Sequence, residues 1–142
     1  MIAVGSDHAG YELKNQLMEH LKNRGYEVKD YGTYSEASCD YPDYAKQVAN
    51  AVASGEAEKG LLVCGTGIGM SIAANKVKGI RAAVLSDEFS AEATRSHNDA
   101  NILCLGARVV DYPKAEKLLD IFLDTPFSAE EKHIRRISKL ED

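Results

Sequence analysis

Short apolar runs alternate with helical segments along this chain, and this alternation limits the fold more than any other feature. The runs have the length of buried strands and lie at residues 2–4, 26–31, 60–64, 80–85 and 102–105. Between the first two, Leu13, Leu17 and Leu21 form one apolar stripe of a helix, opposite charged side chains that include Lys14. Strands that alternate with helices are typical of βαβ units. We predict an α/β fold, a three-layer α/β/α sandwich around a mainly parallel, five-stranded, Rossmann-like sheet.

Helical patterns also occur further along the chain and at its end. Pro42 and Pro113 each suit the first turn of a helix, and residues 88–96 form another helical segment. Residues 130–142 are amphipathic and contain four Lys and Arg side chains, which predicts a last helix. With 142 residues and no internal repeat, the chain suits a single domain over residues 1–142.

Composition excludes several classes of protein. The formal net charge of −5 argues against a nucleic-acid binder, and no segment is long enough to cross a membrane. The three cysteines, Cys39, Cys64 and Cys104, are far apart and form no CxxC pair, so neither a disulfide framework nor a zinc site is indicated. The chain begins directly with an apolar run and lacks the regions of a secretory signal. We therefore expect a protein of the reducing cytoplasm.

A glycine-rich turn at residues 64–69, with the sequence CGTGIG, follows the third predicted strand and precedes a helical segment. Ligands bind at the carboxyl ends of parallel strands, and glycines let backbone N–H groups approach an anion closely. A thiol beside a helix N-terminus is favoured as thiolate, so Cys64 is a candidate base or nucleophile. The alternative is a buried cysteine that acts as a small hydrophobe, which is how we interpret Cys104. Cys39 lies in a polar loop and has no comparable signal.

The same turn must be weighed against a dinucleotide site. The dinucleotide fingerprint requires glycine at position 70, where this chain has Met70. Asp87 follows the turn by about twenty residues, which is the separation along the sequence expected of a ribose-binding acid. A nucleotide-binding module therefore stays as an alternative.

Ser6, Asp7 and His8 follow the first predicted strand and should share a sheet edge with Cys64. Three contiguous residues cannot readily form a hydrolytic triad, because neighbouring side chains point in different directions. Asp7 either caps the following helix or takes part in the site. Its expected closeness to Cys64 favours a functional role.

His97 lies in a polar run, residues 96–101, that precedes the last predicted strand. The run can simply cap a helix and turn the chain, whereas His97 can also carry protons near neutral pH. His97 should lie near the amino end of a strand, while Cys64 lies at a carboxyl end. If both act in one reaction, a second subunit supplies one of them. Arg108 and Arg136 suit a phosphate group, because guanidinium binds phosphate bidentately.

Six motifs together resemble the type B ribose-5-phosphate isomerases, in family order and over nearly the whole chain. They are GSDHAG at 5–10, DYP at 40–42, CGTGIG at 64–69, AANK at 73–76, HND at 97–99 and GARVV at 106–110. The resemblance implies aldose–ketose isomerisation of ribose 5-phosphate and ribulose 5-phosphate through an enediol or enediolate, in the pentose phosphate pathway. It implies neither a metal nor a nucleotide cofactor. Related isomerases of allose 6-phosphate or galactose 6-phosphate share the pattern, so a hexose phosphate stays as an alternative substrate.

The resemblance also implies a role for each matching residue. Cys64 would be the base that moves a proton between neighbouring carbons, and Thr66 would pass a proton between the sugar oxygens. Asp7 and His97 would assist ring opening. The turn amides would stabilise the oxyanion, at Gly65, Gly67, Ile68 and Gly69. The remaining residues would bind the sugar or its phosphate, namely Asn98, Tyr41, His8, Arg108 and Arg136.

The family resemblance further implies a homodimer, or a dimer of dimers, whose active sites are shared between subunits. A C-terminal helix near residues 129–141 would contribute to the subunit interface. One departure concerns phosphate binding: many relatives have Gly-Gly-Arg-His where this chain has Glu130, Glu131, Lys132 and His133. The resemblance assigns phosphate binding to Lys132 as well, where a point-charge ammonium replaces a forked guanidinium.

Overall fold

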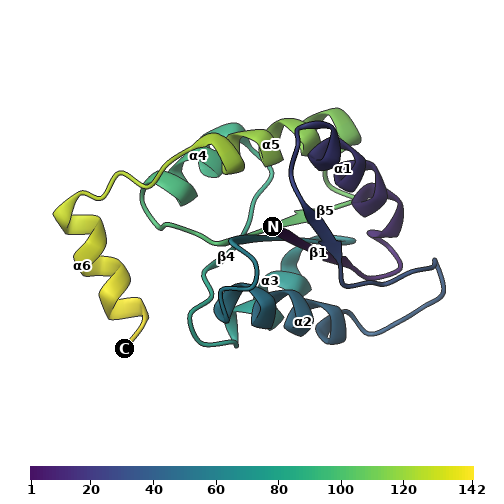
Figure 1. Cartoon of the computed structure of the whole chain (residues 1–142), viewed down its shortest axis with the longest axis horizontal. Helices are drawn as coiled ribbons and strands as arrows, with labels where there is room; N and C mark the ends of the chain where they lie inside the picture. Colours follow the sequence, from purple (N-terminus) through teal and green to yellow (C-terminus); the bar gives the residue numbers. More distant parts are fainter.

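A parallel sheet lies between two layers of helices in the computed structural model, which describes all residues 1–142 (Figure 1). The five strands, in the spatial order β2-β1-β3-β5-β4, are β1 (Ile2–Ser6), β2 (Val28–Asp30), β3 (Lys59–Cys64), β4 (Ala82–Val84) and β5 (Ile102–Gly106). The helices are α1 (Tyr11–Asn23), α2 (Tyr41–Ala53), α3 (Ile68–Asn75), α4 (Glu88–Ser96), α5 (Tyr112–Asp124) and α6 (Glu131–Leu140). All strand pairs are parallel. The predicted three-layer α/β/α sandwich is confirmed.

The two edge strands are shorter than predicted. β2 covers three residues of the predicted 26–31, and β4 covers three of the predicted 80–85. Each has a single neighbour, so its hydrogen bonding extends only as far as one partner strand allows. β1 and β3 have neighbours on both sides and are longer.

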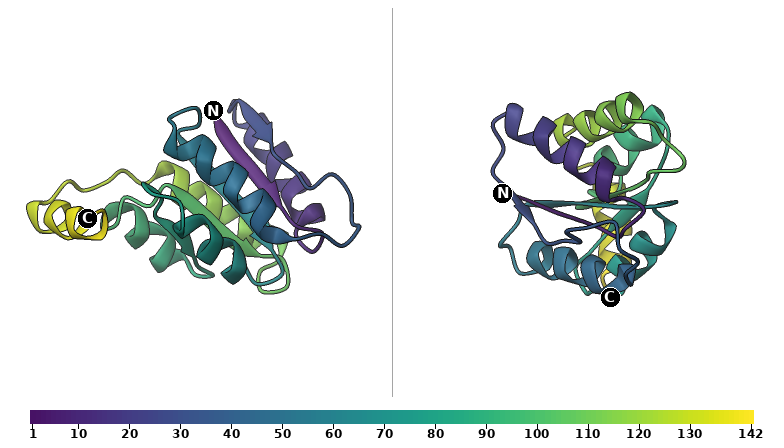
Figure 2. Two further views of the ribbon diagram at one scale, coloured as in Figure 1. Left: turned by 90° about the horizontal axis from the view of Figure 1, so that it is seen from below. Right: turned by 90° about the vertical axis from the view of Figure 1, so that its right-hand side faces the viewer.

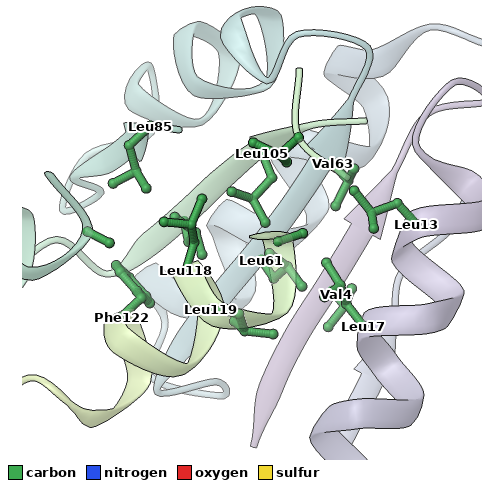
Figure 3. Close-up of a cluster of buried hydrophobic side chains, with 14 of the residues drawn as sticks. Val4, Leu13, Leu17, Leu61, Val63, Leu85, Leu105, Leu118, Leu119 and Phe122 are labelled. Carbon is green, nitrogen blue, oxygen red and sulfur yellow. The ribbon is translucent and has the colours of Figure 1, made fainter. Parts of the chain in front are cut away.

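The sheet is buried on both faces, which explains why its central strands are continuously apolar. α1, α4 and α5 cover one face, and α2 and α3 cover the other, as the end-on view in Figure 2 shows. Figure 3 shows the first face, where Leu61 and Val63 of β3 lie between Leu17 of α1 and Leu118 of α5. On the second face Val48 of α2 and Met70 of α3 are fully buried.

The strand order places a ligand crevice beside β1 and β3. The chain leaves β1 for β2 on one side and later returns to β3 on the other, with Ser6 of β1 opposite Val63 of β3. Ligands of open α/β sheets bind at the carboxyl ends of strands where the order reverses in this way. The segments after β1 and β3 are therefore the expected walls of a site.

Lys14 is buried within the α1 layer rather than lying on the charged face where the sequence places it. Its side chain is 0% exposed, and its ammonium binds both carboxylate oxygens of Asp30, at 2.8 and 3.1 Å. The ammonium also donates to the carbonyl of Thr33 and lies near the rings of Tyr11 and Tyr34. A buried ammonium needs such partners, so Lys14 joins α1 to β2 and to the loop after it.

We expect Lys14→Met to lower the free energy of unfolding by about 3 kcal/mol, because removal of one partner leaves the other charge poorly compensated. Asp30 keeps its bond from the Gly32 amide and is 25% exposed, which favours the lower end of the usual range. Urea denaturation measures the change. Lys29→Met is the matched control, since Lys29 pairs with Glu56 at the surface and its loss should change stability little. Equal effects of the two substitutions would contradict this account.

α6 projects from the end of the molecule opposite to the carboxyl ends of β1 and β3 (Figure 1, Figure 2). Its Ile134 and Leu140 are 51% and 67% exposed, and His133 is its buried residue. None of the helices combines the length and the apolar character needed to cross a lipid bilayer.

Candidate active site

Cys64 ends β3 at the predicted position, and the backbone around it is held tightly. Its carbonyl accepts the Ala107 amide at 2.8 Å, and the carbonyl of Gly65 accepts the Arg108 amide at 3.0 Å. The Sγ atom of Cys64 accepts the amide of Gly67 at 3.1 Å, and Cys64 is 5% exposed. The sulfur is therefore fixed in position, with an N–H donor aimed at it.

Glycine is required at position 67 for this contact. Gly67 has a left-handed backbone with φ of 79°, and a Cβ atom there would lie 2.9 Å from the backbone carbon of Leu105. The turn is thus pressed against the end of β5, which fixes the direction of the Gly67 amide toward the sulfur.

Fewer backbone amides of the turn are free to bind an anion than the sequence predicts. The amide of Gly67 is used by Cys64, and the amide of Ile68 donates to the hydroxyl of Thr66 at 3.2 Å. The amides of Gly65, Thr66 and Gly69 donate no hydrogen bond within the chain. Unpartnered amides at the start of a helix are ready donors for an anion.

Asp7 and His8 follow β1 and face the same cavity as Cys64. Asp7 is 7% exposed, and its carboxylate accepts the amide of Gly10 at 3.0 Å. Asp7 therefore holds the turn before α1 and also lines the site, but it does not cap the helix as the structural alternative expected, because the N-cap of α1 is Gly10 and has no side-chain bond. His8 Nδ1 accepts the amide of Cys39 at 3.3 Å, which leaves Nε2 as the protonated ring nitrogen of the neutral imidazole.

The cavity has a volume of about 480 Å³ and is lined largely by predicted site residues. These are Asp7, His8, Tyr41, Cys64, Gly65, Thr66, Ile68, Gly69 and Arg108. Ala9 and Ile72 also line it and were not predicted. Ile72 lies one helical turn after Ile68 and is 56% exposed, a position that a helical projection from Ile68 would have identified.

Tyr41 and Arg108 form two walls of the cavity through contact with glycines. A Cβ atom on Gly69 would lie 2.6 Å from the Tyr41 ring, and one on Gly65 would lie 3.3 Å from an Arg108 guanidinium nitrogen. The absence of side chains at Gly65 and Gly69 therefore lets an aromatic ring and a guanidinium approach the turn. Together they offer a flat apolar surface and a positive charge beside Cys64.

His97, Asn98, Lys132 and Arg136 do not line this cavity. His97 caps the C-terminus of α4 and is exposed, as are Lys132 and Arg136 on α6. Asn98 lines a separate hollow of about 680 Å³ between β4 and the end of α6. One chain therefore does not bring these four residues to Cys64, which agrees with the topological difficulty expected from the sequence.

The other two cysteines have different surroundings. Cys104 on β5 is fully buried, and burial, with the nearby Cys64 as a smaller cause, raises the pKa of its thiol well above the usual range. This agrees with the interpretation of Cys104 as a small core hydrophobe. Cys39, which carried no signal in the sequence, contacts His8 through its amide and lies with its sulfur 3.9 Å from Nδ1.

One group of side chains outside the cavity has residue types that bind metal ions. His20 lies between Glu116 and Asp120. Its Nδ1 is 3.3 Å from a carboxylate oxygen of Glu116, and its Nε2 is 2.7 Å from one of Asp120. Because each nitrogen has its own carboxylate and Arg24 also pairs with Asp120 at 2.7 Å, this is an ion-pair network that joins α1 to α5.

Asp87 does not occupy the position of a ribose-binding acid. It caps α4, and its bonds from the amide and hydroxyl of Ser90 hold the pKa of its carboxyl below the usual value. The turn after β3 does approach β4, because a Cβ atom on Gly67 would lie 2.9 Å from Val84, but the Asp87 carboxylate is bonded to Ser90 within α4. The geometry thus argues against the dinucleotide interpretation.

Comparison with known proteins identifies the relatives of this arrangement. Residues 2–140 match the Ribose/Galactose Isomerase family. Ribose-5-phosphate isomerase B of Escherichia coli is 48% identical over 139 residues, which cover 98% of this chain and 93% of the relative. The structure of the Clostridium thermocellum ribose-5-phosphate isomerase B matches with a TM-score of 0.97 and 51% identity, covering 99% and 94% of the two chains. The Mycoplasma genitalium enzyme with bound ribulose-5-phosphate matches with a TM-score of 0.94 and 43% identity, covering 99% and 93%.

Proposed function

Since this chain belongs to the ribose/galactose isomerase family, we propose that it interconverts ribose 5-phosphate and ribulose 5-phosphate, a reaction of the pentose phosphate pathway. The observation that carries this proposal is that a thiol and unpartnered amides lie in the same cavity. Cys64 offers a base for a carbon-bound proton, and Gly65, Thr66 and Gly69 offer donors for the oxyanion that forms as the proton leaves.

In the proposed reaction the Cys64 thiolate removes the proton from C2 of the open-chain aldose. The electron pair of the C2–H bond forms a C1–C2 double bond, and negative charge collects on O1 of the enediolate. Return of the proton to C1, with transfer of the O2 proton to O1, gives the ketose. The step is an isomerisation with no net gain or loss of protons or electrons, so it needs no oxidant.

Thr66 suits the transfer between the two sugar oxygens. Its Oγ1 accepts the Ile68 amide, so its own hydroxyl proton is free to donate to the substrate. Asp7 and His97 are proposed to assist ring opening, and Tyr41 and Asn98 to position the sugar. Gly67 and Ile68 act differently from the other turn residues, because their amides hold Cys64 and Thr66.

The phosphate group is proposed to lie against His8 and Arg108. His8 presents its Nε2–H as a donor, and the Arg108 guanidinium brings a permanent positive charge to the cavity. Arg136 and Lys132 are proposed to complete this charge from a neighbouring subunit.

A homodimer, or a dimer of dimers, with shared active sites is proposed for this reason. The residues that would assist from α4 and α6 are exposed and lie away from the cavity of their own chain. Apolar side chains are also exposed at both places, with Ile68 at 53% by the cavity and Ile134 at 51% on α6. A second copy that brings its α6 over the cavity would cover both. The free thiols of all three cysteines support a reducing compartment, so we propose that the protein acts in the cytoplasm.

A substrate panel tests the proposed function. We expect kcat/KM for ribose 5-phosphate to exceed that for allose 6-phosphate and galactose 6-phosphate by at least about tenfold. Isomerisation of a hexose phosphate without that of ribose 5-phosphate would instead identify a hexose 6-phosphate isomerase. No turnover of any sugar phosphate, together with tight binding of a nucleotide, would support the nucleotide-binding alternative.

A further inference from the structure

The side chains of His97 and His133 are stacked on each other. Their ring centroids are 4.5 Å apart and their planes differ by 16°. His97 lies at the end of α4, whereas His133 lies in the first turn of α6, a helix that projects from the body (Figure 1). His133 is 8% exposed and is the buried residue of that helix. The helix therefore buries one side chain, and it does so against His97.

Further contacts fix the His133 ring and the turn that carries His97. Nε2 of His133 lies 3.3 Å from a carboxylate oxygen of Glu130, the residue that caps α6. On the other side, Arg95 bonds to Asp99 at 2.8 Å and to the carbonyl of Ala100 at 2.7 Å, which holds the turn after His97. The stack thus connects a fixed turn to a fixed helix start.

The charges around His133 favour its neutral form. Burial lowers the pKa of His133, and His97, Lys132 and Arg136 lower it further, while Glu130 acts in the opposite direction. Two stacked imidazoles also repel each other when both are protonated. A neutral His133 supports the neighbouring ring without adding a positive charge beside it.

We propose that His133 is a positioning residue for His97, and that Glu130 orients the plane of His133. This proposal rests on the proposed function, in which His97 assists ring opening of the sugar phosphate. His133 acts through the ring it supports and does not itself bind substrate or carry the proton. Its contribution is to restrict the rotation of the exposed His97 side chain, because orientation of a catalytic group accounts for much of its efficiency.

Two substitutions at position 133 distinguish stacking on His97 from proton transfer by His133. His133→Phe keeps a ring for stacking and cannot titrate, whereas His133→Leu removes the plane. We expect His133→Leu to lower kcat for ribose 5-phosphate about tenfold with KM changed less than about twofold, since an interaction made in the transition state is lost. His133→Phe should keep kcat within about threefold of wild type, with the acid limb of the pH profile unchanged. Lys139→Ala, at an exposed position of α6, is the control.

Nuclear magnetic resonance gives a readout that does not depend on turnover. The ring protons of His97 should show a ring-current shift in the wild-type protein and in His133→Phe, and should lose it in His133→Leu. Wild-type kcat in His133→Leu would overturn the proposal, as would a His133→Phe variant as slow as His133→Leu. A wild-type protein that does not isomerise ribose 5-phosphate would overturn the proposed function instead, and a retained ring-current shift would then establish the stack alone.

Discussion

Cys64→Ala should lower kcat for ribose 5-phosphate by about three orders of magnitude, because a positioned general base contributes on the order of 10²–10⁴ in rate. The substitution removes the sulfur that accepts the Gly67 amide and leaves the glycine turn in place. Substrate binding through His8 and Arg108 should persist, so KM should change much less than kcat. A coupled assay of ribulose 5-phosphate formation measures both constants.

Cys104→Ala is the matched control for this substitution. It removes a buried sulfur from β5, the strand next to Cys64, and the high pKa of Cys104 keeps that thiol protonated. We expect kcat of Cys104→Ala to stay within about threefold of wild type, because a group that stays protonated does not act as the base. A large loss in both variants would point to disturbed packing, and retention of activity in Cys64→Ala would exclude Cys64 as the base.

Restored activity in a mixed dimer is the second large effect that we expect. Cys64→Ala and His97→Ala should each be at least about a hundredfold less active than wild type, since each lacks one acid or base group. When both variants are co-expressed with different tags and the heterodimer is purified, one of its two sites takes an intact Cys64 from one subunit and an intact His97 from the other. That heterodimer should show about half of the wild-type activity, as twofold symmetry requires.

The opposite result is equally clear. If each site lies within a single chain, both sites of the heterodimer carry one defect and its activity stays at the level of the variants. The reason to expect complementation is structural, because His97 stacks on His133 at α6 and does not line the cavity that contains Cys64.

Local patterns were sufficient to predict the elements that have strong signals at their ends. The predicted helix at residues 88–96 matches α4, which Asp87 caps through the Ser90 amide. The glycine turn was placed correctly because it joins a buried strand to a helix. The edge strands β2 and β4 were predicted too long, because pairing with one neighbour, and not apolar character, determines where they end.

Contacts between distant segments were beyond local patterns. Lys14 has the helical position of a surface residue, and its burial depends on Asp30, which approaches only when β2 joins the sheet. The division of the turn amides between Cys64, Thr66 and the open cavity depends on the left-handed Gly67. The stack of His97 on His133 depends on the segment between α5 and α6, which places the start of α6 beside the end of α4. The composition of α6 does not encode that placement.

Proton exchange with solvent tests the role of Cys64 most directly. When the wild-type protein converts ribose 5-phosphate in D₂O, deuterium should enter C1 of ribulose 5-phosphate, because the thiol that carries the substrate proton also exchanges with water. Cys64→Ala should incorporate deuterium about a thousandfold more slowly, in step with its loss of turnover. Incorporation by Cys64→Ala at the wild-type rate would contradict the account, since another group would then move the proton between the two carbons.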